Sequence, residues 1–85
     1  MDKAKTDIRG KIAELAAQLG NDAAALQDDD LIPMTGLLDS AALFELIAWY
    51  EQRFGLHLKQ DEINIDNFGT VQAMTDYAGK NGTLP

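Results

Sequence analysis

The segment from Ser40 to Phe54 contains neither glycine nor proline and is rich in helix-forming residues. Because successive residues of a helix are about 100° apart, its larger apolar side chains fall on one side. Gly55 follows the segment directly, and glycine is the residue that most often ends a helix. We therefore predict an amphipathic helix over Ser40–Phe54. Its core-facing residues are Leu43, Leu46, Ile47, Tyr50 and Phe54.

Small and polar side chains occupy the opposite face of this predicted helix. That face consists of Ala41, Glu45, Ala48 and Gln52. Two alanines and a single acid leave little steric bulk there, which favours a docking surface over an ordinary solvated one. Phe44 and Trp49 flank the core stripe on either side. We expect both to pack within the fold, with contact to a partner as the alternative.

Apolar residues also recur at helical spacing near both ends of the chain. We predict a first helix from Lys3 to Leu19, ended by Gly20-Asn21, and a last helix whose N-cap is Thr70. Between the second and last helices, Asp61–Ile65 suits a short helical turn whose isoleucines reach the core. The inward residues are Ile8, Ile12, Leu15, Ala16 and Leu19 in the first helix, and Val71, Met74, Tyr77 and Ala78 in the last.

A long connection, residues 21–39, joins the first two helices and contains three consecutive aspartates and the helix breaker Pro33. Its length indicates that it packs against the fold and has a function. The expected anchors are Leu26, Leu31, Met34 and Leu37. The fold class is therefore all-α: a bundle of three longer helices and one short helix, with a long loop between the first two. We expect a single domain over residues 1–85, with an ordered core of about 3–80 and a frayed tail at 81–85.

The composition limits the functions open to this chain. Its 85 residues include no cysteine and one histidine, His57, which gives no basis for a disulfide, a thiolate metal site or a serine–histidine–aspartate triad. The net charge is −7, with four bases against three acids in residues 1–19 and eleven acids against three bases in residues 20–85. Such a surface repels nucleic acid and anionic lipid. No apolar stretch reaches the length of a membrane span. We expect a cytoplasmic, monomeric protein that is not an enzyme.

Asp39 and Ser40 stand directly before the second helix, where either side chain could cap it. The main-chain N–H groups at a helix N-terminus are unpaired and carry partial positive charge, so a phosphodiester on Ser40 is favoured there. Gly36 allows the preceding loop to turn and leave the serine hydroxyl accessible. On this dipeptide alone, a simple cap is the more common explanation.

Four blocks of sequence, in this order of helices, resemble the acyl carrier protein family. They are Gly36–Ser40 before the second helix, Glu45-Leu46 within it, Glu51–Phe54 at its end and Thr70–Tyr77 in the last helix. The resemblance covers nearly the whole chain, most closely residues 36–78. It implies that Ser40 bears a covalent 4′-phosphopantetheine arm from coenzyme A, whose thiol holds acyl or aminoacyl groups as thioesters. It further implies that Asp39 caps the helix and contacts the phosphopantetheinyl transferase that attaches the arm.

The same resemblance implies a loading ligase and downstream transferases or synthases as partners, docking on the face formed by Ala41, Glu45, Ala48 and Gln52. The chain departs from the fatty-acid carriers in two neighbouring positions. Ala41 stands where Leu or Met is common, and Ala42 stands where an acid is common. These departures and the few acids of the second helix favour a specialised lipid, polyketide or aminoacyl pathway. A short cargo could be sheltered by Leu43, Ile47, Tyr50, Phe54, Ile63, Phe68 and Val71.

One alternative stays open. A small helical bundle could serve as a non-catalytic interaction module, in which Ser40 is merely a helix cap and the face around Ala41 and Ala48 binds a helix of a partner. A test with a phosphopantetheinyl transferase and coenzyme A separates the two hypotheses, because only the carrier gains mass at Ser40.

Overall fold

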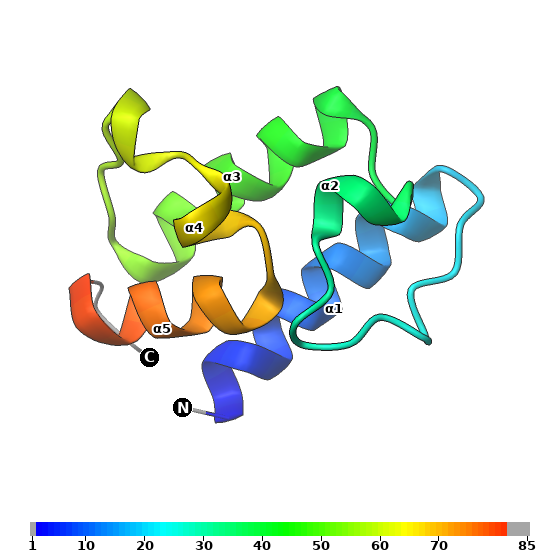
Figure 1. Ribbon diagram of the computed structural model, residues 1–85, viewed down its shortest axis with the longest axis horizontal. Helices are drawn as coiled ribbons and strands as arrows, with labels where there is room; N and C mark the ends of the chain where they lie inside the picture. The colour runs from blue at the N-terminus through cyan, green and yellow to red at the C-terminus, as the bar shows by residue number, and fades with distance from the viewer. Residues whose placement is uncertain (1, 82–85) are drawn as a thin grey trace.

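Three long helices, α1 (Asp2–Gln18), α3 (Ser40–Phe54) and α5 (Val71–Asn81), form the framework of the molecule (Figure 1). The computed structural model describes residues 2–81. Within them the shorter elements are α2 (Ile32–Thr35), the 3₁₀ turn η1 (Gln60–Glu62) and α4 (Ile65–Phe68). Helix α1 packs against both α3 and α5, and α4 packs against α5. The predicted all-α bundle is confirmed, with three short elements where the sequence predicted one.

Helix α3 has the bounds predicted from the sequence, because the signals at its ends are local. Gly55 adopts a φ of 65°, and the N–H groups of Gly55 and Leu56 both donate to the carbonyl of Glu51. Gly20 follows α1 with a φ of 79°. A left-handed backbone costs other L-residues roughly 1–2 kcal/mol, so glycine stops a helix at such positions.

The core lies where the apolar stripes of α1, α3 and α5 meet. Tyr50 and Phe54 are fully buried, with ring centroids 5.1 Å apart, and Phe68 lies 5.2 Å from Tyr50 in an edge-to-face arrangement. Each such aromatic pair contributes about 0.5–1.5 kcal/mol beyond its buried area. The predicted stripes of α1 and α5 are confirmed except at Leu19, which is exposed because the chain has already left the helix after Gln18.

The connection between α1 and α3 is not one continuous loop, because α2 interrupts it. Pro33 stands in the first turn of α2, where its missing N–H removes no helical hydrogen bond. The prediction that Pro33 breaks a helix is therefore wrong, since it helps to begin one. The N–H of Ile32 donates to the carbonyl of Gly69 at 2.7 Å, which fastens α2 to the segment before α5.

Two of the four predicted anchors in this connection are wrong. Leu26 is buried and Leu37 is half-buried, but Leu31 is exposed and Met34 is 78% exposed. Two other side chains, one in α2 and one in the segment after it, are directed inward and complete the set of anchors. They are Ile32 and Leu38, both buried.

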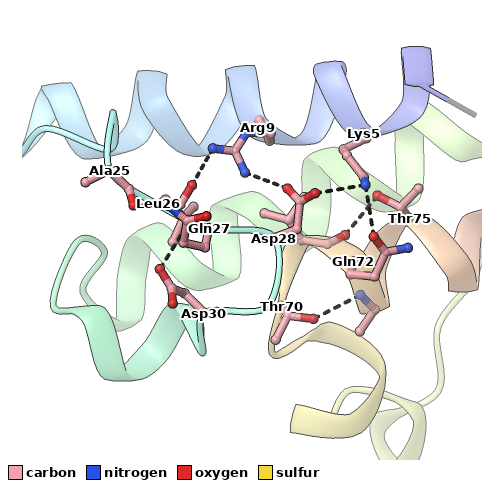
Figure 2. A network of polar contacts seen from close by, with 12 residues as sticks. Lys5, Arg9, Ala25, Leu26, Gln27, Asp28, Asp30, Thr70, Gln72 and Thr75 are labelled. Carbon is pink, nitrogen blue, oxygen red and sulfur yellow. Dashed lines mark hydrogen bonds and ion pairs between the residues drawn. The ribbon is translucent and has the colours of Figure 1, made fainter.

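Figure 2 shows a polar cluster that ties the connection to α1 and α5. The Asp28 carboxylate accepts hydrogen bonds from Lys5 Nζ at 2.9 Å and from Arg9 at 2.8 Å. Its main-chain carbonyl accepts one from the N–H of Gln72 at 3.0 Å. Arg9 also donates to the carbonyl of Leu26. Asp28 therefore joins three segments that are distant in sequence, whereas the sequence shows it only as one of three acids.

Between α3 and α5, the chain forms η1 and α4 in place of the single turn predicted at Asp61–Ile65. Ile63 is 37% exposed and does not reach the core as expected, because it falls between these two elements. The side chain of Ile65 lies outside the described part of the structure. Thr70 caps α5 as predicted, since its hydroxyl accepts a hydrogen bond from the N–H of Ala73 at 3.0 Å. Of the tail expected to fray at residues 81–85, Asn81 instead belongs to the last turn of α5, and residues 82–85 lie outside the described part of the structure.

Candidate functional site

Asp39 is the residue that caps α3. Its carboxylate accepts a hydrogen bond from the N–H of Ala42 at 2.8 Å, and its carbonyl accepts one from Leu43 at 2.9 Å. The backbone of Asp39 is extended, with a φ of −85° and a ψ of −179°, as a capping residue requires. Of the two candidates that the sequence left open, Asp39 therefore performs the capping.

Ser40 is the first residue of α3, and its side chain is exposed. Its hydroxyl makes no hydrogen bond to any residue in the described part of the chain. Because the Asp39 carboxylate accepts the capping hydrogen bond, the Ser40 oxygen is not needed to cap the helix. The arrangement leaves a primary alcohol in solvent, beside main-chain N–H groups that carry partial positive charge.

The segment before Ser40 is held in place at several points. Gly36 ends α2 with a φ of 75°, and the N–H of Leu37 donates to the hydroxyl of Thr35 at 3.2 Å. The side-chain amide of Asn21 donates to the carbonyl of Leu37 at 2.9 Å. Leu38 is buried two residues before the serine. Ser40 therefore stands at the end of a fastened segment, not on a free loop.

The outward direction predicted for one face of α3 is confirmed. The exposed residues of this face are Ala41, Glu45, Ala48 and Gln52. Ala42, by contrast, is buried, as are Leu46, Tyr50 and Phe54. This burial provides a physical reason for the small, uncharged residue at position 42, because an acidic side chain there would enter the core.

The two aromatic residues that flank the core stripe have different environments. Trp49 is half-buried and packs on the core, with its ring centroid 6.0 Å from that of Phe54. Phe44 is 73% exposed, so the prediction that it packs within the fold is wrong. The reason is its angle on the helix, because Phe44 lies only about 40° around the axis from Ser40 and faces solvent with it. Its spacing of four residues from Ser40 is the sequence signal that indicates this position.

A small apolar depression lies on the other side of Ser40, between α3, α2 and the segment around α4. Its volume is about 200 Å³, and it is lined by Pro33, Leu43, Ile47, Ile63, Asn64, Phe68 and Gly69. Four residues predicted to shelter a cargo, Leu43, Ile47, Ile63 and Phe68, therefore come together here. The other three, Tyr50, Phe54 and Val71, are fully buried in the core and do not line the depression. The contributions of Pro33, Asn64 and Gly69 follow only from the tertiary structure.

Glu62 and Tyr77 fasten the segment that forms one wall of the depression to α5. The Tyr77 hydroxyl donates a hydrogen bond to the Glu62 carboxylate at 2.8 Å. Hydrogen bonds from the main-chain N–H of Lys59 and from Tyr77 lower the pKa of Glu62 below its ordinary value. The bond to Glu62 in turn raises the pKa of Tyr77. The pair therefore stays as a carboxylate and a phenol near neutral pH.

Comparisons with family models, with curated proteins and with solved structures give no match to this chain. Within residues 2–81, no helix has both the length and the apolar character needed to cross a membrane. The same residues contain no cluster of three or more histidine, aspartate or glutamate side chains suited to hold a metal ion.

Proposed function

We propose that this protein is a carrier that holds acyl or aminoacyl groups on a 4′-phosphopantetheine arm attached to Ser40. The observation that carries the proposal is that the two adjacent residues at the start of α3, Asp39 and Ser40, have different roles. Asp39 caps the helix, and the Ser40 hydroxyl remains exposed and without a hydrogen-bond partner among the described residues. A serine used only as a cap would itself accept the hydrogen bond that Asp39 accepts.

The residues around Ser40 fit a phosphodiester. The helix N-terminus favours negative charge, and the first turn of α3 contains no acidic side chain, so the nearest carboxylate is that of the capping Asp39, which the N–H of Ala42 holds. Thr35, Leu38 and Asn21 belong to contacts that fasten the preceding segment, which gives a modifying enzyme a defined target. Asp39, exposed beside the serine, supplies the carboxylate that we propose the phosphopantetheinyl transferase contacts.

When bound, the arm would supply the thiol on which acyl or aminoacyl groups are carried as thioesters. The chain's own residues provide the attachment point, the surface that partners recognise and a place for a short cargo. We propose that the depression beside Leu43 and Ile47 takes that cargo, because both residues lie on the flank of α3 next to Ser40. A ligase would load the carrier, and transferases or synthases of a specialised lipid, polyketide or aminoacyl pathway would unload it.

The test is modification by a broad-specificity phosphopantetheinyl transferase with coenzyme A, followed by intact-protein mass spectrometry. We expect the wild type to gain one phosphopantetheine and Ser40→Ala to gain none. Circular dichroism of Ser40→Ala should match the wild type, because the hydroxyl makes no hydrogen bond within the described structure. An unmodified wild type, or an equal mass gain in Ser40→Ala, would contradict the carrier function and favour the interaction module.

A further inference from the structure

The peptide groups of Leu37, which stands three residues before Ser40, are held by side chains of two other elements. Its carbonyl accepts a hydrogen bond from the side-chain amide of Asn21 at 2.9 Å. Its N–H donates to the hydroxyl of Thr35 at 3.2 Å. Within residues 2–81, neither group bonds to another main-chain group. The path of the chain into α3 therefore depends on these two side chains.

Asn21 is itself fixed by the end of α1. Gly20 has a φ of 79°, and its N–H donates to the carbonyl of Ala17 at 3.0 Å. The N–H of Asn21 donates to the carbonyl of Ala16 at 2.8 Å. These two bonds form a Schellman motif, which fixes the backbone of the residue after the glycine. The sequence predicted Asn21 as part of a helix stop, whereas the structure makes its amide a link from α1 to the segment before Ser40.

The two hydrogen bonds to Leu37 connect it to different parts of the fold. The Thr35 hydroxyl also donates to the carbonyl of Ile32 at 2.7 Å, so its bond joins the segment to the neighbouring helix α2. Asn21 lies sixteen residues away along the chain, at the end of a long helix of the framework. Its bond therefore fixes the segment before Ser40 relative to α1.

Resting on the proposed carrier function, we propose that Asn21 is a positioning residue for the modification of Ser40. In that reaction the Ser40 oxygen forms a bond to the β-phosphorus of coenzyme A, and the phosphoanhydride bond breaks. The hydroxyl proton passes to a base, and adenosine 3′,5′-bisphosphate departs. Displacement at phosphorus requires the attacking and leaving oxygens to lie roughly in line. By fixing the segment that leads into α3, Asn21 limits the movement of the attacking hydroxyl away from this geometry.

The kinetics of Ser40 modification by a broad-specificity phosphopantetheinyl transferase test this role, with coenzyme A saturating and the carrier as the varied substrate. We expect Asn21→Ala to lower kcat about tenfold with little change in KM, because the reacting hydroxyl is less well placed while the surface of α3 is unchanged. Asn21→Asp should lower kcat at least as much, since a carboxylate cannot donate to the Leu37 carbonyl. Asn21→Gln keeps an amide donor and should restore part of the loss.

Asn67→Ala is the matched control for Asn21→Ala. The side-chain amide of Asn67 donates to the main-chain carbonyl of Glu62 at 2.9 Å, so this variant loses the same kind of bond on a different segment. Its kcat should equal that of the wild type. Asn21 is exposed, so its truncation leaves no cavity, and circular dichroism should show that both variants are folded. Equal losses of kcat in the two variants would overturn the positioning role and assign the effect to general stability.

Amide hydrogen exchange gives a second measurement, which does not depend on the transferase. The N–H groups of Ala42 and Leu43 both donate to Asp39, so their exchange reports opening of the first turn of α3. Exchange at both should be faster in Asn21→Ala than in the wild type and unchanged in Asn67→Ala. Unchanged exchange, or an unchanged kcat with normal modification of the wild type, would overturn the positioning role and leave the carrier function in place. Absence of any modification of the wild type would instead contradict the carrier function, and the positioning role with it.

Discussion

The hydroxyl of Tyr50, in the middle of α3, donates a hydrogen bond of 2.6 Å to the main-chain carbonyl of Met74 in α5. Both residues are fully buried. Burial raises the pKa of Tyr50 well above its ordinary value, so the hydroxyl remains a donor at neutral pH. This contact links the helix that begins at Ser40 to the last helix, through the centre of the core.

Replacing Tyr50 with phenylalanine removes this hydrogen bond and keeps the ring. We expect the free energy of unfolding to fall by about 1 kcal/mol, the usual net contribution of such a bond. Tyr50→Ala should cost about 3–5 kcal/mol, because it also leaves a cavity. Urea unfolding followed by circular dichroism measures both. Equal stabilities for Tyr50→Phe and the wild type would contradict the contribution of the hydrogen bond.

Asp39→Ala and Ser40→Ala should have different effects on stability, although the two residues are adjacent. Asp39→Ala removes the cap of α3 and should lower the free energy of unfolding by about 1 kcal/mol. Ser40→Ala should change it by less than about 0.5 kcal/mol, because that side chain has no partner within the described residues. Thermal or urea unfolding of the two variants gives the comparison. A larger loss in Ser40→Ala would identify the serine as the structural cap.

Asp28 should make the stability depend on pH in the acid range. The hydrogen bond from Lys5 is the largest cause that lowers the pKa of Asp28 below its ordinary value of 3.8. A carboxyl whose pKa is lower in the folded state stabilises the fold fully above the unfolded-state pKa, and that contribution is lost as the pH falls through the folded-state pKa. Asp28→Asn should therefore be less stable than the wild type at pH 7, and the difference should shrink below a pH of about 4.

Urea unfolding of the wild type and Asp28→Asn at neutral and acid pH tests this dependence. Asp29→Asn is the matched control, because Asp29 is exposed and lies next to Asp28 in the same acidic run. The control should lose little stability at either pH. A constant difference between wild type and Asp28→Asn from pH 7 to pH 3 would show that the loss has a cause other than the carboxylate charge.

If the carrier function holds, a short acyl group on the arm should occupy the depression beside Ser40. Loading should then shift the NMR methyl signals of Leu43, Ile47 and Ile63, which line it. The signals of Ile8 and Ile12 should stay in place, because these residues are fully buried in the α1 stripe and do not line the depression. Comparison of the acylated form with the form carrying the bare arm isolates the cargo. Equal spectra for the two forms would place the cargo outside the depression.

The sequence alone predicts the position of Ser40 at the start of α3, but it predicts the surfaces on the two sides of Ser40 only in part. Asp39 and Ser40 could be identified as the start of α3, because capping depends on the residues next to the helix. The depression could be predicted only in part, since Pro33 and Asn64 reach it from segments on either side of α3 along the chain. The exposure of Phe44 was missed because a large apolar residue beside a core stripe is usually buried.

By itself, the sequence determined the all-helical class, the bounds of α3 and the stripes of α1 and α5, because periodicity, caps and terminating glycines act within a few residues. The tertiary structure alone decided that Ile32 and Leu38 are buried in place of Leu31 and Met34. It also decided that Asp28 joins α1 to α5. The physical reason is the same for both: which side of a short segment faces inward depends on all the elements that it meets, and several of these, such as α1 and the segment before α5, lie far away in the sequence.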